Sequence, residues 1–145
     1  MTDYRDDNVF ARILRGELPA HRVFEDEHTL AFMDIMPQVD GHTLVIPKFP
    51  AQDLFDLPPE LLGHTLLTTQ RIGRAVRRAF AAPGLMVAQL SGAAAGQTVF
   101  HVHFHILPRY AGAEFRMHAR DMAPGALLAE HAARVRAALA EIGEG

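Results

Sequence analysis

The chain has 145 residues, 49% of them hydrophobic and 21% charged, which is enough for one domain with a substantial buried core. Its net charge of −3, the lack of a long apolar stretch and the lack of a secretory pattern exclude a broad nucleic-acid-binding face, a membrane span and export. It has no cysteine, which excludes disulfides and thiolate zinc sites, so we expect a cytoplasmic protein without nucleic-acid or membrane partners.

The first third of the chain predicts a short helix followed by three strands. Asp7 or Asn8 can cap the helix, Gly16 suits its C-terminal end, and Pro19 blocks its continuation. Runs of β-favouring residues between turn signals then predict strands. The predicted elements are a helix over residues 6–18 and strands over 22–25, 29–34 and 43–47.

The rest of the chain predicts two longer helices and two more strands. The first long helix has proline in its first turn and apolar residues at helical spacing, which we interpret as core. The predicted elements are helices over 58–80 and about 126–141 and strands over 85–90 and 101–107. With no repeat and no linker, residues 1–145 are expected to form one α+β domain: a five-stranded antiparallel sheet with two main helices.

Three histidines at alternate positions, His101, His103 and His105, are the most informative feature of the sequence. Alternate residues of a strand share a face, so a strand here places three imidazoles in one row and the apolar residues between them in a core. A single histidine on a strand is more often structural. Three in register are unfavourable for packing alone, because each ring carries polar nitrogens that need partners.

A loop of small residues, 92–98, precedes these histidines. Small residues let backbone N–H groups approach an anion closely, and Gln97 and Thr98 add side-chain donors. Alone, such a loop could be a plain surface turn, and it lacks the lysine of a P-loop. Joined to three histidines, it predicts a phosphate held against an imidazole nucleophile, because imidazole with a pKa of ~6.5 is largely neutral at cytoplasmic pH.

Metal binding is the main competing interpretation of the histidine row. Histidines at i and i+2 of a strand can both coordinate zinc. However, no cysteine is available, no carboxylate lies between the three histidines, and a metal site would give the preceding loop no role. We therefore expect neither a metal nor a cofactor.

Several segments, in order along the chain, resemble the histidine triad (HIT) superfamily. They are residues 16–19, 24–27, 31–35, 41–48, 95–99 and the signature His-φ-His-φ-His-φ-φ at 101–107. The resemblance implies an antiparallel sheet, two main helices and homodimers, which we expect to form through the 58–80 helix and the strand near 85–90.

The resemblance also implies roles for individual residues. His103 would be the nucleophile that forms a nucleotidyl-histidine intermediate, with His101 and His105 beside it and His42 as a fourth active-site histidine. Asp34 would bind the ribose hydroxyls, although by itself it could also be a turn residue. The base pocket would be lined by Phe10, Ile13, Leu18, Phe32 and Ile35, which could also be ordinary core, and the phosphate loop would contain Gly96, Gln97 and Thr98.

Two positions depart from the family's pattern. Many bacterial relatives carry a Cys-x-x-Cys motif that helps to hold zinc, where this chain has Asn8 and Ala11. Relatives often have Asn or Gln about seven residues before the loop glutamine, where this chain has Leu90. The first departure implies a metal-free scaffold, and the second leaves the orientation of the substrate open.

The function implied by the resemblance is hydrolysis at the α-phosphate of a purine nucleotide conjugate, with release of a nucleoside monophosphate. The third histidine favours a hydrolase over the family's nucleotidyltransferase branch, which carries glutamine there. The sequence does not separate nucleoside phosphoramidates from dinucleoside polyphosphates as substrates. A nucleotide-binding regulatory module with incidental turnover is the alternative.

Overall fold

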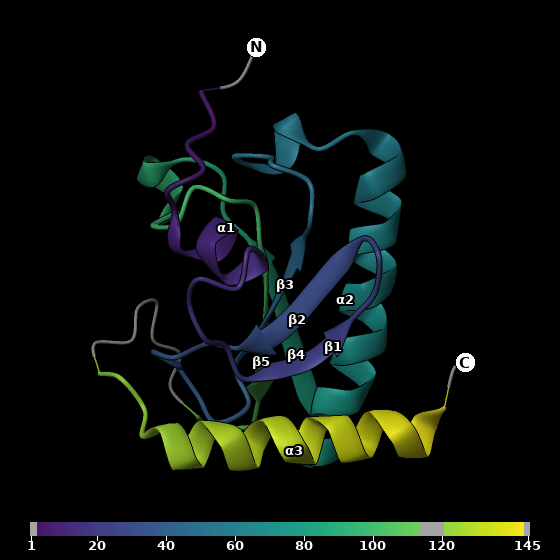
Figure 1. Ribbon diagram of the computed structural model, residues 1–145. Coiled ribbons are helices and arrows are strands. Elements are labelled where there is room, and N and C mark those ends of the chain that lie inside the picture. The colour runs from purple at the N-terminus through teal and green to yellow at the C-terminus, as the bar shows by residue number, and fades with distance from the viewer. Residues whose placement is uncertain (1–2, 114–120, 144–145) are drawn as a thin grey trace.

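The computed structural model describes residues 3–113 and 121–143 (Figure 1). In chain order the elements are α1 (Val9–Leu14), β1 (Arg22–Glu25), β2 (Thr29–Met33), β3 (Thr43–Pro47), the 3₁₀ turn η1 (Leu54–Asp56), α2 (Pro59–Ala79), β4 (Gly84–Gln89), the 3₁₀ turn η2 (Ala93–Ala95), β5 (Phe104–Arg109) and α3 (Gly125–Ile142). Within those residues, no helix has the length and apolar character needed to cross a bilayer.

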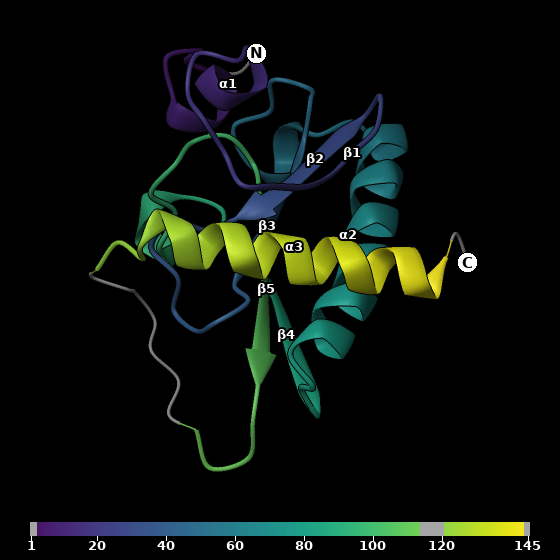
Figure 2. The ribbon, with the colours of Figure 1, turned by 60° about the horizontal axis from the view of Figure 1, so that its bottom comes forward.

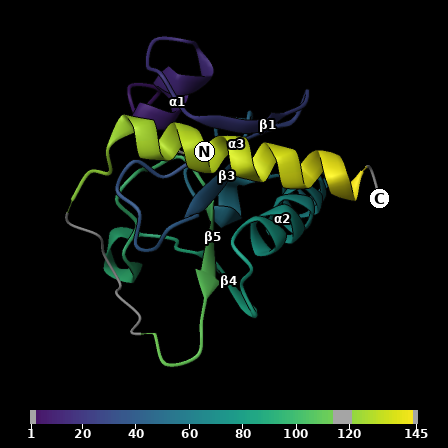
Figure 3. The same cartoon turned by 90° about the horizontal axis from the view of Figure 1, so that it is seen from below.

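The five strands form one antiparallel sheet in the order β1-β2-β3-β5-β4, which confirms the predicted fold class. The helices α2 and α3 pack against this sheet and against each other. Figures 2 and 3 show α3 lying across the sheet, and it meets α2 near the C-terminal end of α2, where the ring of His131 packs against Phe80 at 5.1 Å.

Both faces of the central strands are buried, and alternate residues contribute to different cores. Ala31, Met33 and Val45 pack with α2 and α3, whereas Phe32 and Leu44 pack on the opposite face with α1. This arrangement explains why β2 and β3 consist entirely of buried residues. The second core lies directly beside the functional residues described below.

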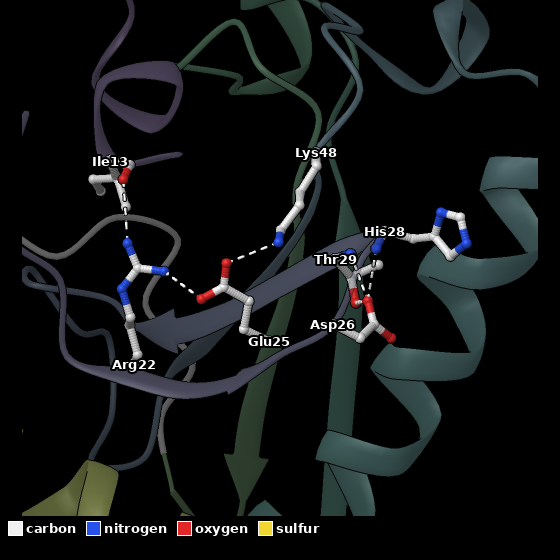
Figure 4. A network of polar contacts seen from close by, with 7 residues as sticks. All are labelled: Ile13, Arg22, Glu25, Asp26, His28, Thr29 and Lys48. Atoms are coloured by element: carbon white, nitrogen blue, oxygen red, sulfur yellow. Dashed lines mark hydrogen bonds and ion pairs between the residues drawn. The ribbon is translucent and has the colours of Figure 1, made fainter. Parts of the chain in front are cut away.

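A polar network on β1 ties the edge of the sheet to its neighbours (Figure 4). Glu25 accepts hydrogen bonds from Arg22 and Lys48, each at 2.8 Å, and the Lys48 ammonium lowers the pKa of Glu25. Arg22 also donates to the carbonyl of Ile13 at 3.3 Å. These contacts fix the C-terminal end of α1 against β1 and the residue after β3.

The opening helix is shorter than the predicted 6–18. Asn8 is its N-cap, with a side chain that accepts from the Ala11 N–H at 2.9 Å. The helix ends at Leu14, because Gly16 adopts a positive φ of +78° that reverses the chain. Leu18 therefore lies after the helix and reaches the second core from a turn.

The last strand begins three residues later than predicted, at Phe104 in place of His101. Phe104 pairs with Val45 on one side and with Gln89, the last residue of β4, on the other, so no ladder continues before it. The N–H of Val102 donates instead to the carbonyl of Ala51 at 2.9 Å. His101 and His103 therefore precede the strand, and the prediction that all three histidines lie on it was wrong.

Candidate active site

Asp34 and His42 meet at the two ends of the connection between β2 and β3. The N–H of Asp34 donates to the carbonyl of His42 at 3.0 Å, and the His42 side chain is buried. Gly41, directly before it, has a φ of +91°, and a Cβ there would lie 2.8 Å from the Phe80 ring. Only glycine fits this close approach, which fixes where His42 enters the site.

His42 and His105 form a directed hydrogen-bond chain. The N–H of Gln38 donates to Nδ1 of His42 at 3.1 Å, so this neutral imidazole carries its hydrogen on Nε2. Nε2 of His42 lies 2.9 Å from Nδ1 of His105 and donates to it, and it also lies 3.4 Å from the Asp34 carboxylate. Since Nδ1 of His105 accepts, the hydrogen of His105 is on Nε2.

His101 and His103 carry their hydrogens in a different pattern. Nε2 of His101 lies 2.8 Å from the carbonyl of Pro47, which can only accept, so His101 is protonated on Nε2. Nδ1 of His103 lies 2.8 Å from the backbone carbonyl of His101, so His103 is protonated on Nδ1. Nε2 of His103 therefore keeps a lone pair, as a nucleophile requires.

Burial keeps the imidazoles of His42, His101 and His103 neutral. It lowers the pKa of His101 to about 4 and, with the nearby His105 and His103, the pKa of His42 to about 3. Burial also lowers the pKa of His103. The same cause raises the pKa of Asp34 to about 6, so its contact with His42 is that of a carboxylate with a neutral N–H donor and not an ion pair.

An apolar cluster lies against the histidines. The Phe10 ring meets the His103 ring edge-to-face, with centroids 4.9 Å apart, and meets Phe32 at 5.4 Å. Ile13 belongs to the same buried cluster and Leu18 packs at its margin. Ile35 differs: it lies outside this cluster and is 48% exposed, next to Asp34. Four of the five predicted pocket residues therefore pack together.

The loop before the histidines has a defined shape. Gly92 and Gly96 adopt φ angles of +94° and +104°, which favour glycine. Gln97 holds the loop together: its Oε1 accepts from the N–H of Gly92 at 2.8 Å, and its Nε2 donates to the carbonyls of Gln52 and Val99. The expectation that the Gln97 side chain donates to a phosphate is therefore wrong, because its donors already have partners.

The neighbouring positions add two details that the sequence reasoning missed. Val99 packs at the margin of the apolar cluster and so links the loop to it, while exposed Thr98 lines a surface cavity of about 370 Å³. Beside Leu90, the Ser91 hydroxyl donates to the Gln89 amide at 3.0 Å. The polar side chains that flank Leu90 therefore contact each other.

Asp34, His42 and His105 also have the composition of a metal site, with potential ligand atoms within 4.8 Å of one another. The sequence reasoning missed this group because it looked for a carboxylate only between the three histidines in sequence. A ligating imidazole carries its hydrogen on the other nitrogen. A metal on Nε2 of His42 would require a hydrogen on Nδ1. Nδ1 instead accepts from the Gln38 N–H, so metal binding would have to break this hydrogen bond. The group is better suited to a hydrogen-bond chain.

A buried histidine cluster beside an apolar cluster, directly after a glycine-bearing loop, is typical of the histidine triad class. The HIT domain family model matches residues 15–112, and the chain belongs to this family. The structure is similar to that of a Hit-like protein from Bartonella henselae, with a TM-score of 0.88, 46% identity, and coverage of 93% of this chain and 98% of that one.

Two further relatives bear on the chemistry. A Zn-bound histidine triad family protein from Mycobacterium smegmatis has a TM-score of 0.83 and 41% identity, over 94% of this chain and 95% of that one. Adenylylsulfatase HINT3 of Arabidopsis thaliana is 36% identical over 105 residues, which are 72% of this chain and 53% of that protein.

Proposed function

We propose that the protein is a nucleotide-binding hydrolase that cleaves purine nucleotide conjugates at the α-phosphate through a nucleotidyl-His103 intermediate. The observation that carries this proposal is the opposite placement of hydrogens on two adjacent rings. His103 keeps a lone pair on Nε2, and His105, whose ring centroid lies 4.9 Å away, carries its hydrogen on Nε2. The relative named as an adenylylsulfatase supports the same class of reaction.

The residues would divide the reaction as follows. Nε2 of His103 attacks the α-phosphorus, and a P–N bond forms as the bond to the leaving group breaks. The carbonyl of His101 stabilises the positive charge on His103 through its Nδ1–H. Nε2–H of His105 donates a hydrogen bond to the leaving group, which takes its proton from water. A second water then attacks phosphorus and gives its proton to the solvent, which breaks the P–N bond, releases the nucleoside monophosphate and restores His103.

The apolar cluster around Phe10 and Phe32 would contact the base, and Asp34 would accept hydrogen bonds from the ribose. The Phe10 ring contacts both Phe32 and His103, which places an apolar surface next to the proposed nucleophile. The backbone of Gly96 to Thr98 would face the phosphate. The Leu90 position contributes no side-chain polar group, so sugar and phosphate contacts would depend on Asp34 and this loop.

Substrate kinetics and chemical trapping test this proposal. Adenosine 5′-phosphoramidate, adenosine 5′-phosphosulfate and diadenosine tri- and tetraphosphate would be compared as substrates at steady state. Rapid quenching with α-labelled substrate should trap label on His103, stable in base and labile in acid, as a P–N bond is. Tight AMP binding with turnover near background for every substrate would favour the regulatory module instead. Label on another residue would overturn the assignment of His103.

We infer that two copies of the chain pair through α2 and the open edge of β4. The strand β4 ends the sheet on one side, and Val87 on it is 50% exposed. Leu66 and Leu67 on α2 are 45% and 65% exposed, so an apolar surface accompanies an unpaired strand edge. Light scattering at micromolar protein should give the mass of a dimer, and Leu67→Glu should shift it toward that of a monomer. A monomeric mass for the wild type would contradict the inference.

We also propose that turnover requires no bound metal. Asn8, at a position where many bacterial relatives have a zinc-binding cysteine, caps α1 with its amide oxygen. Activity should persist after treatment with a chelator. Stoichiometric zinc that is lost together with activity would instead favour metal binding at Asp34, His42 and His105.

A further inference from the structure

A tyrosine near the N-terminus contacts the first histidine of the triad, 97 residues away in sequence. The Tyr4 hydroxyl lies 2.6 Å from Nδ1 of His101, and the two rings meet edge-to-face at 5.7 Å. His101 donates from Nε2 to the Pro47 carbonyl, so its Nδ1 carries a lone pair. The Tyr4 hydroxyl must therefore be the donor.

Asn8 sets the direction of the Tyr4 hydroxyl. Its Nδ2 donates to the Tyr4 oxygen at 3.0 Å and to the Arg5 carbonyl at 2.8 Å, while its Oδ1 accepts from the Ala11 N–H. Because the amide donates to Tyr4, the hydroxyl hydrogen is left to point at His101. The hydrogen bonds thus run in one direction from Asn8 through Tyr4 and His101 to the Pro47 carbonyl.

These hydrogen bonds pass through His101, the residue whose backbone carbonyl contacts the proposed nucleophile. His101 precedes β5, so no sheet ladder fixes it, and its imidazole is held between Tyr4 and Pro47. Its own carbonyl accepts the Nδ1–H of His103. We propose that Tyr4, oriented by Asn8, is a positioning residue that fixes His101 and thereby the ring orientation of His103. The proposal rests on the proposed function, in which His103 is the nucleophile.

Three variants separate positioning from general stability. Tyr4→Phe removes the hydroxyl that donates to Nδ1 of the buried His101. Asn8→Asp keeps an oxygen to cap α1 but replaces the donor to Tyr4 by a carboxylate, which competes with His101 for the hydroxyl hydrogen. Tyr110→Phe is the matched control, because it removes a tyrosine hydroxyl that donates to the Phe80 carbonyl at 2.7 Å, remote from the triad.

We expect Tyr4→Phe to lower kcat for adenosine 5′-phosphoramidate by about tenfold, the effect of one well-placed hydrogen bond. Asn8→Asp should act in the same direction. AMP affinity should be retained in both, because neither side chain belongs to the apolar cluster that includes Phe10 and Phe32. Tyr110→Phe should leave kcat unchanged, and thermal unfolding of all three variants shows whether each is folded.

Side-chain ¹⁵N NMR of the resting protein supplies a readout that a structural role would not move. Wild-type spectra should show His101 protonated on Nε2 and His103 on Nδ1, and both site variants should change the His101 nitrogen signals. Unchanged His101 signals, or changed signals with an unaltered kcat, would overturn the proposal. Trapping of label on His103 tests the nucleophile separately, so a failure of the proposed function can be recognised while the NMR result still reports on Tyr4 and His101.

Discussion

The two histidine pairs of the site consist of the same residue type but present opposite groups to the space between them. In the pair His101–His103, backbone carbonyls accept from both rings, so His103 keeps a lone pair on Nε2. In the pair His42–His105, a backbone N–H donates into the first ring, so His105 carries hydrogen on Nε2. The His101 backbone carbonyl fixes the hydrogen of His103 on Nδ1, whereas the Gln38 N–H, which donates into His42, fixes the hydrogen of His105 on Nε2 through His42.

This difference shows how identical side chains can acquire different roles in one reaction. The acceptor end of one pair suits attack on phosphorus, and the donor end of the other suits a hydrogen bond to the leaving group. Burial supports both assignments, because the lowered pKa values of His42, His101 and His103 keep these rings neutral near pH 7. Single substitutions at the site residues separate these two roles.

The largest effect is expected for His103→Ala, which removes the lone pair. Turnover should fall to the uncatalysed background, because the variant has no ring nitrogen at this position to attack phosphorus. AMP binding should be retained, because Ile13, Phe32 and the Gln97 loop are intact. Steady-state kinetics and calorimetric titration measure the two properties. Full activity in His103→Ala would contradict the assignment of the nucleophile to the pair His101–His103.

His105→Ala removes the donor and is expected to slow turnover by about 10²–10³-fold, a typical loss for one hydrogen bond to developing negative charge. The loss should shrink for substrates whose leaving group develops less negative charge. His64→Ala is the matched control, because His64 stacks on His28 at 3.9 Å and takes no part in the hydrogen-bond chains described for the four site histidines. An equal loss with every leaving group would argue against a hydrogen bond from this position to the leaving group.

Asp34→Ala tests whether the carboxylate beside His42 binds the ribose. AMP binding should weaken by about 1.5–3 kcal/mol, as expected for a charge-assisted hydrogen bond, and the preference for AMP over deoxy-AMP should disappear. Because burial raises the pKa of Asp34 to about 6, the wild-type preference should also decline as the pH falls below 6. An unchanged preference in the variant would reduce Asp34 to a turn residue.

The smallest effect concerns how His101 changes the free energy of unfolding with pH. The unfolded chain protonates His101 below pH 6.5, but burial lowers its pKa in the fold to about 4. The free energy of unfolding should therefore fall as the pH drops from 6.5 toward 4. His101→Gln can preserve both hydrogen bonds without titrating, so its loss of stability between pH 7.5 and 5 should be about 2 kcal/mol smaller than that of the wild type. Urea denaturation at the two pH values measures this difference, and identical losses would contradict the cause given for the shift.

The fold was largely predictable because local signals and burial agree along most of the chain. The strands β1 and β3 have the predicted bounds, β2 ends one residue earlier, and α2, β4 and α3 differ by one residue at each end. The start of β5 was not predictable, because the alternation of histidines and apolar residues continues before Phe104. There the backbone bonds to Ala51 in place of a neighbouring strand.

The sequence by itself determined which chemistry this protein can carry. It supplied the histidines, the apolar set around Phe10 and Phe32, and Gly41 and Gly96 at backbone positions with positive φ. The tertiary structure decided that Gln97 holds its loop together with its own donors, and it decided which nitrogen of each ring carries the hydrogen. For His101 and His105 that choice depends on partners far away in sequence, Pro47 and His42. For His103 and His42 it depends on the backbone conformation of nearby residues, which the folded structure fixes.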